Sequence, residues 1–398
     1  MWVEALDLLW AKLEADARFN PLQVSALAGA AQQHTSIYWS HQASQTLHHL
    51  DPKQPLAPQM QRCFAVTETP TWQDASTATE CQELEQRLGG PRRLAGLTGS
   101  RAYERFTINQ IAKLYKHDPD RYHQCHRISL ASSFLGSLLL GDFMPIDYAD
   151  GSGMNLVDLN HRTWAVEVID AVADRSLLAK LGAAPKLSES TSRSLVASQT
   201  IVGTVGQYWT QRYQLPSDCK VLAFTGDNPA SLLGLPARIS ELVVSLGTSD
   251  TAFFTSETKH PGLDGHVLCH PLDPDRTYMT LLCTKNGSLT REWARDQYCQ
   301  GSWDRFNQAL SRTSPGCEDL VGCYLRVPEI LPHAHGIRQF RASRLQADGA
   351  WQFTPLAEFP QPHWNIRALV EFQALNMKHY VSQKGLGVPS RIVAMGGA

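Results

Sequence analysis

The sequence predicts an α/β protein made of two domains. Segments with apolar residues at helical spacing alternate with short apolar runs that are typical of buried strands. With 398 residues, of which 43% are hydrophobic, the chain is longer than one hydrophobic core usually supports. We expect domains 1–217 and 218–398, because a stretch rich in Ser, Thr and Lys and then a turn come before a clear strand at 221.

The first domain is expected to begin with an amphipathic helix. Charged residues separate apolar residues that recur at helical spacing: Trp2, Leu6, Leu9 and Leu13. The apolar segment 24–28 then predicts a buried strand that leads to the polar residues 32–34. Further helical patterns cover 79–88 and the segment that starts at 106, and Asp118 with Pro119 predicts the turn that closes the latter.

The second domain is expected to open with strands. The apolar run 221–225 predicts a strand that ends at Gly226, Asp227 and Asn228, just before a helix. Segments 242–246 and 251–255 predict a hairpin around the small polar residues 247–250. The last segment is an apolar strand from Val393 that ends in two glycines.

Composition and charge exclude several classes of protein. The 36 basic and 38 acidic residues give a net charge of −2, so neither a nucleic acid nor a membrane surface is an expected partner. No apolar stretch reaches the ~20 residues of a membrane helix. The nine cysteines form no C-x-x-C pair, and the N-terminus lacks the pattern of a secretory signal. These features predict a cytoplasmic protein.

The strand end at Asp227 and Asn228 carries the sharpest candidate site. It brings a carboxylate and an amide to the rim of a sheet, where ligands bind in α/β proteins. The alternative is that either residue only caps the helix that begins at Pro229, and the two interpretations have about even weight.

Four other segments could carry chemistry, each with an ordinary alternative. The backbone N–H groups of turn 247–250 could hold a phosphate, or the turn could be a plain hairpin. Residues 32–34 suit hydroxyl groups of a ligand, although a lone His is more often structural. Segment 98–105 could present arginines to a ligand or only a solvated charge pair, and the C-terminal glycines could approach a nucleotide. The sequence contains no P-loop and no G-x-S-x-G motif, and its His pairs lack partners at metal spacing.

Taken together and in this order, the segments resemble the FGGY family of carbohydrate kinases, and within it the xylulokinases. The resemblance covers nearly the whole chain and rests on these segments: 30–39, 97–107, 145–155, 221–234, 243–251 and 285–289. It implies two actin-like (ribonuclease H-like, ASKHA) domains around a cleft, with sugar held mainly by the first domain and nucleotide mainly by the second. The implied reaction is phosphorylation of D-xylulose, or a related ketopentose, to D-xylulose 5-phosphate with ATP and Mg²⁺.

The resemblance also implies roles for single residues. Asp227 would be the general base that takes the proton from the terminal hydroxyl of the sugar, and Asn228 would bind a neighbouring hydroxyl. The other sugar contacts would come from the first domain, so that they face Asp227 across the cleft: His34 and Arg105. The nucleotide would meet a phosphate loop, an adenosine turn and an aromatic ring: Gly247, Thr248 and Ser249; Gly396 and Gly397; and Trp303. This division of labour suits phosphoryl transfer, which asks for positioning and charge stabilisation.

The chain departs from the family pattern at both ends. Family members open with a three-stranded meander that carries a first phosphate loop, whereas this chain starts at the helix that should follow it. They also continue beyond the last residue, Ala398. The first domain is therefore expected to lack its N-terminal strands, and the second to be incomplete at its end. The alternative function is a catalytically inactive protein of the same fold that acts only as a binding or regulatory partner. The sequence leaves open the activity of this chain, the preferred ketose or polyol, and whether the chain forms a homodimer.

Overall fold

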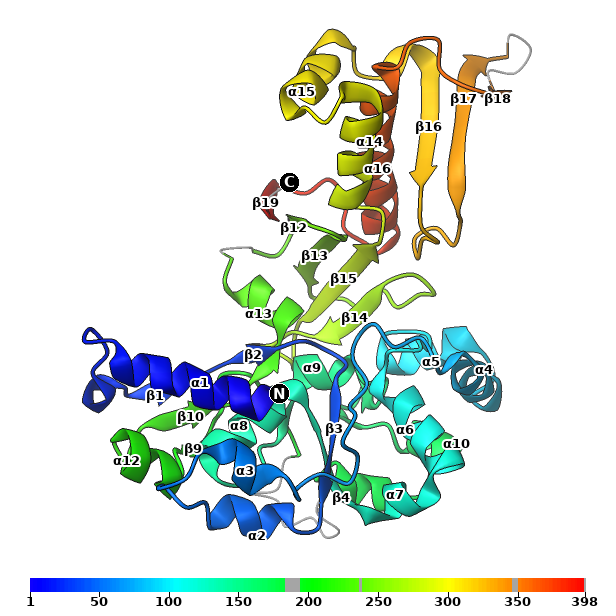
Figure 1. The fold of residues 1–398 in the computed structure, drawn as a ribbon. Helices are drawn as coiled ribbons and strands as arrows, with labels where there is room; N and C mark the ends of the chain where they lie inside the picture. Colours follow the sequence, from blue (N-terminus) through cyan, green and yellow to red (C-terminus); the bar gives the residue numbers. More distant parts are fainter. Residues whose placement is uncertain (183–193, 236–237, 346–349, 397–398) are drawn as a thin grey trace. The chain divides into compact units, whose positions relative to one another are not determined.

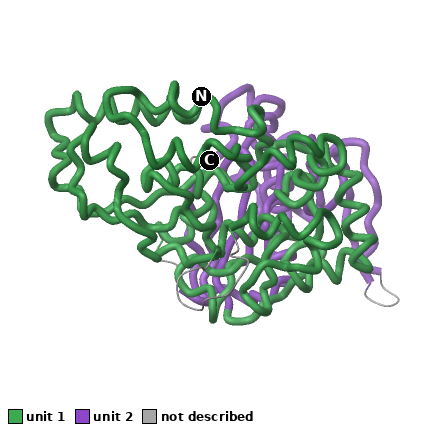
Figure 2. Tube along the Cα trace, turned by 90° about the horizontal axis from the view of Figure 1, so that it is seen from below, with its two compact units in different colours: residues 1–236, 257–279 green, residues 237–256, 280–398 purple. Residues whose placement is uncertain are grey.

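The computed structural model of this chain describes residues 1–182, 194–235, 238–345 and 350–396. The chain forms two compact units, which Figure 2 shows in green and purple. Unit 1 comprises Met1–Pro236 and Glu257–Met279, and unit 2 comprises Ala237–Ser256 and Thr280–Ala398. The chain therefore leaves unit 1, returns to it, and leaves it again.

Unit 1 combines many short helices with short strands (Figure 1). Its helices are α1 (Trp2–Ala15), η1 (Pro21–Gln23), α2 (Ala43–His48), α3 (Leu56–Met60), α4 (Ala78–Arg87), α5 (Pro91–Thr98), α6 (Thr107–His117), α7 (Pro119–Gln124), α8 (Ala131–Leu140), α9 (Tyr148–Ser152), α10 (Val166–Val172), α11 (Ser176–Lys180), α12 (Gln207–Tyr213) and α13 (Asp227–Leu233). Its strands are β1 (Ala26–Leu27), β2 (Ala30–Ala31), β3 (Ser36–Ser40), β4 (Cys125–Leu130), β5 (Ile146–Asp147), β6 (Val157–Asp158), β7 (Thr163–Trp164), β8 (Leu195–Val196), β9 (Ile201–Thr204), β10 (Lys220–Leu222), β11 (Thr225–Gly226) and β14 (His266–Cys269).

Two parallel strand pairs organise the centre of unit 1. β1 pairs with β10, and β2 pairs with β11, where Ala30 lies opposite Thr225 and Ala31 opposite Gly226. Helices α8 and α9 contact β11. Because paired parallel strands end at the same edge, the residues that follow β2 and β11 leave the sheet side by side.

These pairs also explain why the units divide at a place other than 217/218. β10 and β11 follow residue 217, yet they pair with β1 and β2 and so belong to unit 1. The first crossing between the units lies at 236–237 instead. Most of the Ser- and Thr-rich stretch 185–194, on which the expected boundary partly depended, lies outside the described residues.

The helices predicted in unit 1 are confirmed as α1, α4 and α6, and the strand end at 221–226 is confirmed as β10 and β11. In α1, Val3 and Trp10 are buried in one of the two apolar clusters of the unit. The carboxylate of Asp7 on the same helix accepts the backbone N–H groups of Leu56 and Ala57, each at 2.9 Å. Asp7 thereby caps the start of α3, whose first N–H groups have no partner within the helix.

Unit 2 contains a sheet with the predicted hairpin and a second, antiparallel sheet beside long helices (Figure 1). Its elements are β12 (Glu241–Leu246), β13 (Asp250–Ser256), β15 (Tyr278–Thr284), α14 (Ser288–Cys299), α15 (Trp303–Arg312), η2 (Cys317–Asp319), β16 (Leu320–Leu325), β17 (Gly336–Arg344), β18 (Trp351–Leu356), α16 (Trp364–Gln383) and β19 (Arg391–Gly396). β12 forms the hairpin with β13 and pairs in parallel with β19. The hairpin prediction is therefore confirmed.

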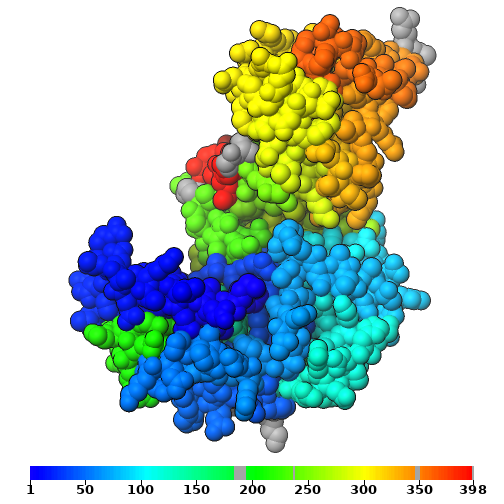
Figure 3. Space-filling view, in the orientation of Figure 1, coloured from blue at the N-terminus to red at the C-terminus, as the bar shows by residue number. Residues whose placement is uncertain are grey.

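Helix α1 lies on the surface of unit 1, as the dark blue atoms of Figure 3 show. Its outer face includes the exposed side chains of Leu8 and Leu9. The helix nevertheless falls short of a membrane span, and none of the other helices within the described ranges has the length and apolarity that a span requires.

We predict that Trp39→Ala lowers the free energy of unfolding of unit 1 by about 3–5 kcal/mol, as is usual for large core aromatics. Trp39 is fully buried, its ring contacts Phe64 and Phe134, and its Nε1–H donates to Ser129 Oγ at 2.9 Å. Equilibrium unfolding in urea measures the change. The matched control is Trp72→Ala, because Trp72 is half exposed and should cost about 0.5 kcal/mol or less. Equal losses in the two variants would contradict this account of the core.

Candidate active site

Asp227 and Asn228 meet Gln33 at the carboxyl ends of β11 and β2. The backbone N–H of Gln33 donates to Asp227 Oδ1 at 3.4 Å, and Asn228 Nδ2 donates to Gln33 Oε1 at 3.0 Å. The backbone N–H of Asn228 also donates to Asp227 Oδ1, at 2.9 Å. The cap of α13 is Gly226, so Asp227 is the first helical residue and not the cap that the alternative interpretation required.

Gln33 connects this pair to a buried carboxylate. Its Nε2 donates to Asp150 Oδ1 at 3.4 Å, and Ser132 Oγ donates to Asp150 Oδ2 at 2.5 Å. Gly226 leaves room for the connection, because a Cβ there would lie 2.4 Å from Gln33 Cγ and 2.8 Å from Asp150 Oδ1. Any larger residue at 226 would push these side chains apart.

Three carboxyl groups near this point differ in their tendency to ionise. Burial raises the pKa of Asp150 to about 8, the charges of Asp147 and Asp227 add to the effect, and the hydrogen bond from Ser132 opposes it. Burial also raises the pKa of Asp147, to about 6, against the hydrogen bonds from Ser198 and Thr225. At neutral pH Asp150 therefore holds a proton, and the negative charge is left to its neighbours.

Asp227 is the accessible member of the three. The residue as a whole is exposed, but protein atoms crowd its carboxylate on the side of Gln33. This partial burial raises the pKa of Asp227 above its usual value, although the N–H groups of Asn228 and Gln33 oppose the shift. An accessible carboxylate with a raised pKa is suited to accept a proton from a hydroxyl group.

His34 is a neutral, buried ring. Its backbone has a left-handed φ of 68°, and its ring stacks on Phe106 with centroids 4.7 Å apart. Nδ1 lies 2.9 Å from the carbonyl oxygen of Gly153, which can only accept, so Nδ1 carries the hydrogen and Nε2 is left as an acceptor. Burial, and after it the charge of Arg105, lowers the pKa of His34 to about 3.

Arg105 also contacts the ring of Phe106. Its guanidinium carbon is 5.4 Å from the centroid of the Phe106 ring and 5.0 Å from that of Tyr103. The four sugar contacts predicted from the sequence therefore belong to one unit. His34 and Arg105 both contact the ring of Phe106. Asp227 and Asn228 both form hydrogen bonds with Gln33, the residue before His34. The expectation that His34 and Asp227 come from different domains is corrected, because β11 pairs with β2.

The predicted phosphate loop lies in unit 2, where Gly247, Thr248 and Ser249 join β12 to β13. The backbone N–H of Ser288 donates to the carbonyl of Gly247 at 2.8 Å. Gly287 must be a glycine, because a Cβ there would lie 2.7 and 2.8 Å from the carbonyl oxygens of Thr248 and Gly247. The residues at the start of α14 (Ser288–Cys299) thus pack against the loop and form a hydrogen bond with its backbone.

Strand pairing brings Gly396 to this loop, because Gly396 lies opposite Leu246, the residue before Gly247. Its φ of 110° and its close approach to Leu246, where a Cβ would be 2.2 Å from the carbonyl oxygen, both require glycine. The predicted Gly397 lies outside the described residues. Trp303 begins α15, and its half-exposed ring lies under the guanidinium of Arg295, 4.8 Å from its carbon.

Several residues of the site escaped the sequence interpretation. Asp147 and Asp150 stood in a segment that carried the family resemblance, and its acidic residues could have drawn attention. His266 Nε2 lies 2.7 Å from Arg105 Nη2, but the two residues are 161 positions apart in the chain, and no sequence pattern connects them. Asp250 ends the turn 247–250 that the sequence indicated, but its buried double hydrogen bond with Arg291, at 2.8 and 3.0 Å, was not indicated by any motif.

We predict that Asp150→Asn changes how stability depends on pH. A carboxyl whose folded pKa exceeds its unfolded value of about 3.9 stabilises the fold at low pH and loses this contribution as pH rises towards the folded value. Relative to the amide variant, the wild-type free energy of unfolding should thus fall by up to about 1.4 kcal/mol per pH unit between about pH 5 and 8. Urea unfolding across this range measures it, with the exposed Asp218→Asn as control. A constant difference between wild type and Asp150→Asn would refute the assignment.

Comparison with known proteins identifies the fold and the family. Residues 64–234 match the model of the FGGY family of carbohydrate kinases, N-terminal domain. The chain is 44% identical over 400 residues to xylulose kinase of Mus musculus, covering all of this chain and 68% of that protein. It is 41% identical to xylulose kinase 2 of Arabidopsis thaliana, again over all of this chain and 70% of the relative.

A solved structure shows the same fold at low sequence identity. The crystal structure of xylulose kinase from Rhodospirillum rubrum matches with a TM-score of 0.76 and 15% identity, covering 100% of this chain and 72% of that one. The chain therefore has the α/β fold of a xylulose kinase of known structure, which agrees with the fold expected from the sequence. By its sequence matches and its fold, this chain belongs to the FGGY family of carbohydrate kinases.

Proposed function

We propose that this chain catalyses the ATP-dependent phosphorylation of D-xylulose to D-xylulose 5-phosphate, with Asp227 as the general base. The observation that carries the proposal is the accessible carboxylate of Asp227 at the carboxyl end of β11, held beside Asn228 and Gln33. The names of the similar proteins, xylulose kinases of a mammal and a plant, support D-xylulose as the sugar.

In the proposed step Asp227 takes the proton of the C5 hydroxyl as the oxygen attacks the γ-phosphorus of ATP. The new O–P bond forms while the bond between the γ-phosphorus and its bridging oxygen breaks, and ADP leaves with that oxygen. The raised pKa of Asp227 makes its carboxylate a stronger base than a free aspartate.

The other predicted residues would bind and orient the two substrates. Asn228 would contact a hydroxyl next to the reacting one, and the neutral Nε2 of His34 would accept from another. Arg105 would donate to a sugar oxygen. In unit 2 the N–H groups of Gly247, Thr248 and Ser249 would meet the phosphates, with Gly396 and Gly397 at the adenosine and Trp303 beside the adenine. Unit 1 would then be the sugar domain and unit 2 the nucleotide domain.

Mg²⁺ is expected to arrive with ATP, bound to its phosphates. Within the described ranges no three His, Cys, Asp or Glu side chains gather in a way that could hold a metal ion. No step of the proposed mechanism is therefore assigned to the ion.

The second candidate, a sugar-binding protein without turnover, differs in one measurable respect. The purified chain is mixed with D-xylulose and ATP, ADP release is followed with a coupled assay, and D-xylulose binding is followed by calorimetry. Release of ADP that depends on D-xylulose supports the kinase. Binding of D-xylulose without any ADP release favours the binding protein, and neither binding nor release overturns both.

We predict that Asp227→Asn lowers kcat by about 100-fold or more and leaves the Kd for D-xylulose within a few-fold of wild type. Because the pKa of Asp227 is raised, wild-type kcat/KM should fall on the acid side at a pH above the usual carboxyl range, and the variant should lack this limb. Steady-state kinetics against pH test both statements, with Asp218→Asn as the exposed carboxylate control. Near-normal turnover of Asp227→Asn would remove Asp227 from the role of base.

A further inference from the structure

We propose that His266 is a positioning residue that sets the orientation of the Arg105 guanidinium toward the sugar. The inference rests on the proposed function, in which Arg105 contacts D-xylulose. His266 begins β14, in the segment of unit 1 that follows the first excursion of the chain into unit 2. It adds to the sugar side of the site a residue that no motif indicated.

The hydrogen bonds of His266 fix its tautomer. Its Nε2 lies 2.7 Å from Arg105 Nη2, and its Nδ1 lies 3.1 Å from Ser100 Oγ. A guanidinium can only donate, so Nε2 must be the acceptor and the ring hydrogen must be on Nδ1, from which it donates to Ser100. The ring is buried and neutral in this arrangement, and it accepts one N–H of Arg105 from a fixed direction.

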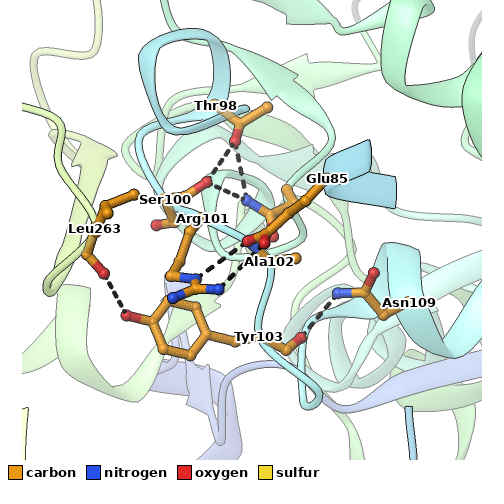
Figure 4. Close-up of polar contacts among 9 residues, drawn as sticks. Glu85, Thr98, Ser100, Arg101, Ala102, Tyr103, Asn109 and Leu263 are labelled. Carbon is orange, nitrogen blue, oxygen red and sulfur yellow. Dashed lines mark hydrogen bonds and ion pairs between the residues drawn. The ribbon is translucent and has the colours of Figure 1, made fainter. Parts of the chain in front are cut away.

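The backbone that carries Arg105 is held by other contacts, which Figure 4 shows. Glu85 accepts from Arg101 Nε and from the backbone N–H of Ala102, both at 3.1 Å. Asn109 Nδ2 donates to the carbonyl of Tyr103 at 2.8 Å, and the hydroxyl of Tyr103 donates to the carbonyl of Leu263. Because the loop has these anchors, loss of the His266 nitrogens should turn the Arg105 side chain and leave the loop in place.

Aromatic contacts place His266 on the same rings as Arg105. The His266 ring lies 4.8 Å from the Tyr103 ring and 5.1 Å from the Phe106 ring, centroid to centroid, and both rings also lie beneath the guanidinium. His34 stacks on Phe106 as well. A phenylalanine at 266 would keep the ring contacts and remove only the nitrogen atoms, which makes it a clean test of the hydrogen bond.

Because a guanidinium is planar, a hydrogen bond from one of its nitrogens also restricts the directions of its other N–H groups. Isomeric sugars differ in the directions in which their hydroxyl groups point. A donor with a fixed orientation can discriminate between these directions, whereas a donor that rotates freely cannot. His266 would therefore contribute to affinity, and to discrimination between ketoses, without touching the sugar.

The test measures D-xylulose binding to the full chain by calorimetry, with thermal unfolding as the check on structure. We expect His266→Phe to raise the Kd about tenfold or more, as loss of a hydrogen bond to a charged group does, and to leave Tm nearly unchanged. His266→Gln, which offers an acceptor oxygen, should regain part of the affinity. His270→Phe, in the same segment but outside the site, should bind as the wild type does.

A double variant separates positioning of Arg105 from a general structural role. Arg105→Ala should weaken binding, and His266→Phe should add no further loss in that background. Equal losses in both backgrounds, or wild-type affinity of His266→Phe, would overturn the inference while the proposed function stands. If His266→Phe unfolds, the same comparison is made with His266→Gln. Failure of the wild-type chain to bind D-xylulose would overturn the proposed function, and this inference with it.

Discussion

The parallel pairing of β2 with β11 is the constraint on which the candidate site depends. Each strand has only two residues, yet the pairing fixes where Gln33 and Asp227 leave the sheet. The positions of the next residues are fixed as well, because His34 follows Gln33 and Asn228 follows Asp227 in the chain. A shift of register by one residue would move Asp227, the proposed base, away from Gln33, whose side-chain amide binds Asn228. Gly226 is required for this arrangement, because a Cβ at this position would clash with the side chains of Gln33 and Asp150.

The buried polar residues beneath this edge leave the negative charge on the one exposed carboxylate of the group, Asp227. Asp147 and Asp150 are fully buried and accept hydrogen bonds from hydroxyl groups, whereas Asp227 is exposed. Two adjacent buried carboxylates are costly to ionise together, so protonation of Asp150 relieves the repulsion. Gln33 can serve both sides, because its amide donates to Asp150 and accepts from Asn228. An apolar or charged side chain at 33 could not do both.

The parts of this site that follow from local patterns were open to prediction, and those that depend on distant contacts were not. Asp227 was predictable because a buried strand that ends in Gly-Asp-Asn must deliver these residues to a sheet edge. The proposed phosphate loop was predictable as a hairpin turn between two apolar strands. The division of the chain was not, since it depends on β10 and β11 pairing with strands almost two hundred residues earlier. His266 was likewise hidden, because its partner Arg105 lies 161 residues away.

The return of the chain to unit 1 at residues 257–279 links that unit to the order of protein synthesis. Val267 and Cys269 are fully buried in its core, and His266 reaches Arg105 from the same strand. Chains emerge from the ribosome with their N-terminus first, and domains tend to fold as they appear. Here the ribosome synthesises the β12–β13 hairpin of unit 2 before it synthesises β14, the last strand of unit 1. We therefore expect the nascent first unit to wait with an unfilled core, a state in which a ribosome-associated chaperone would find exposed apolar surface.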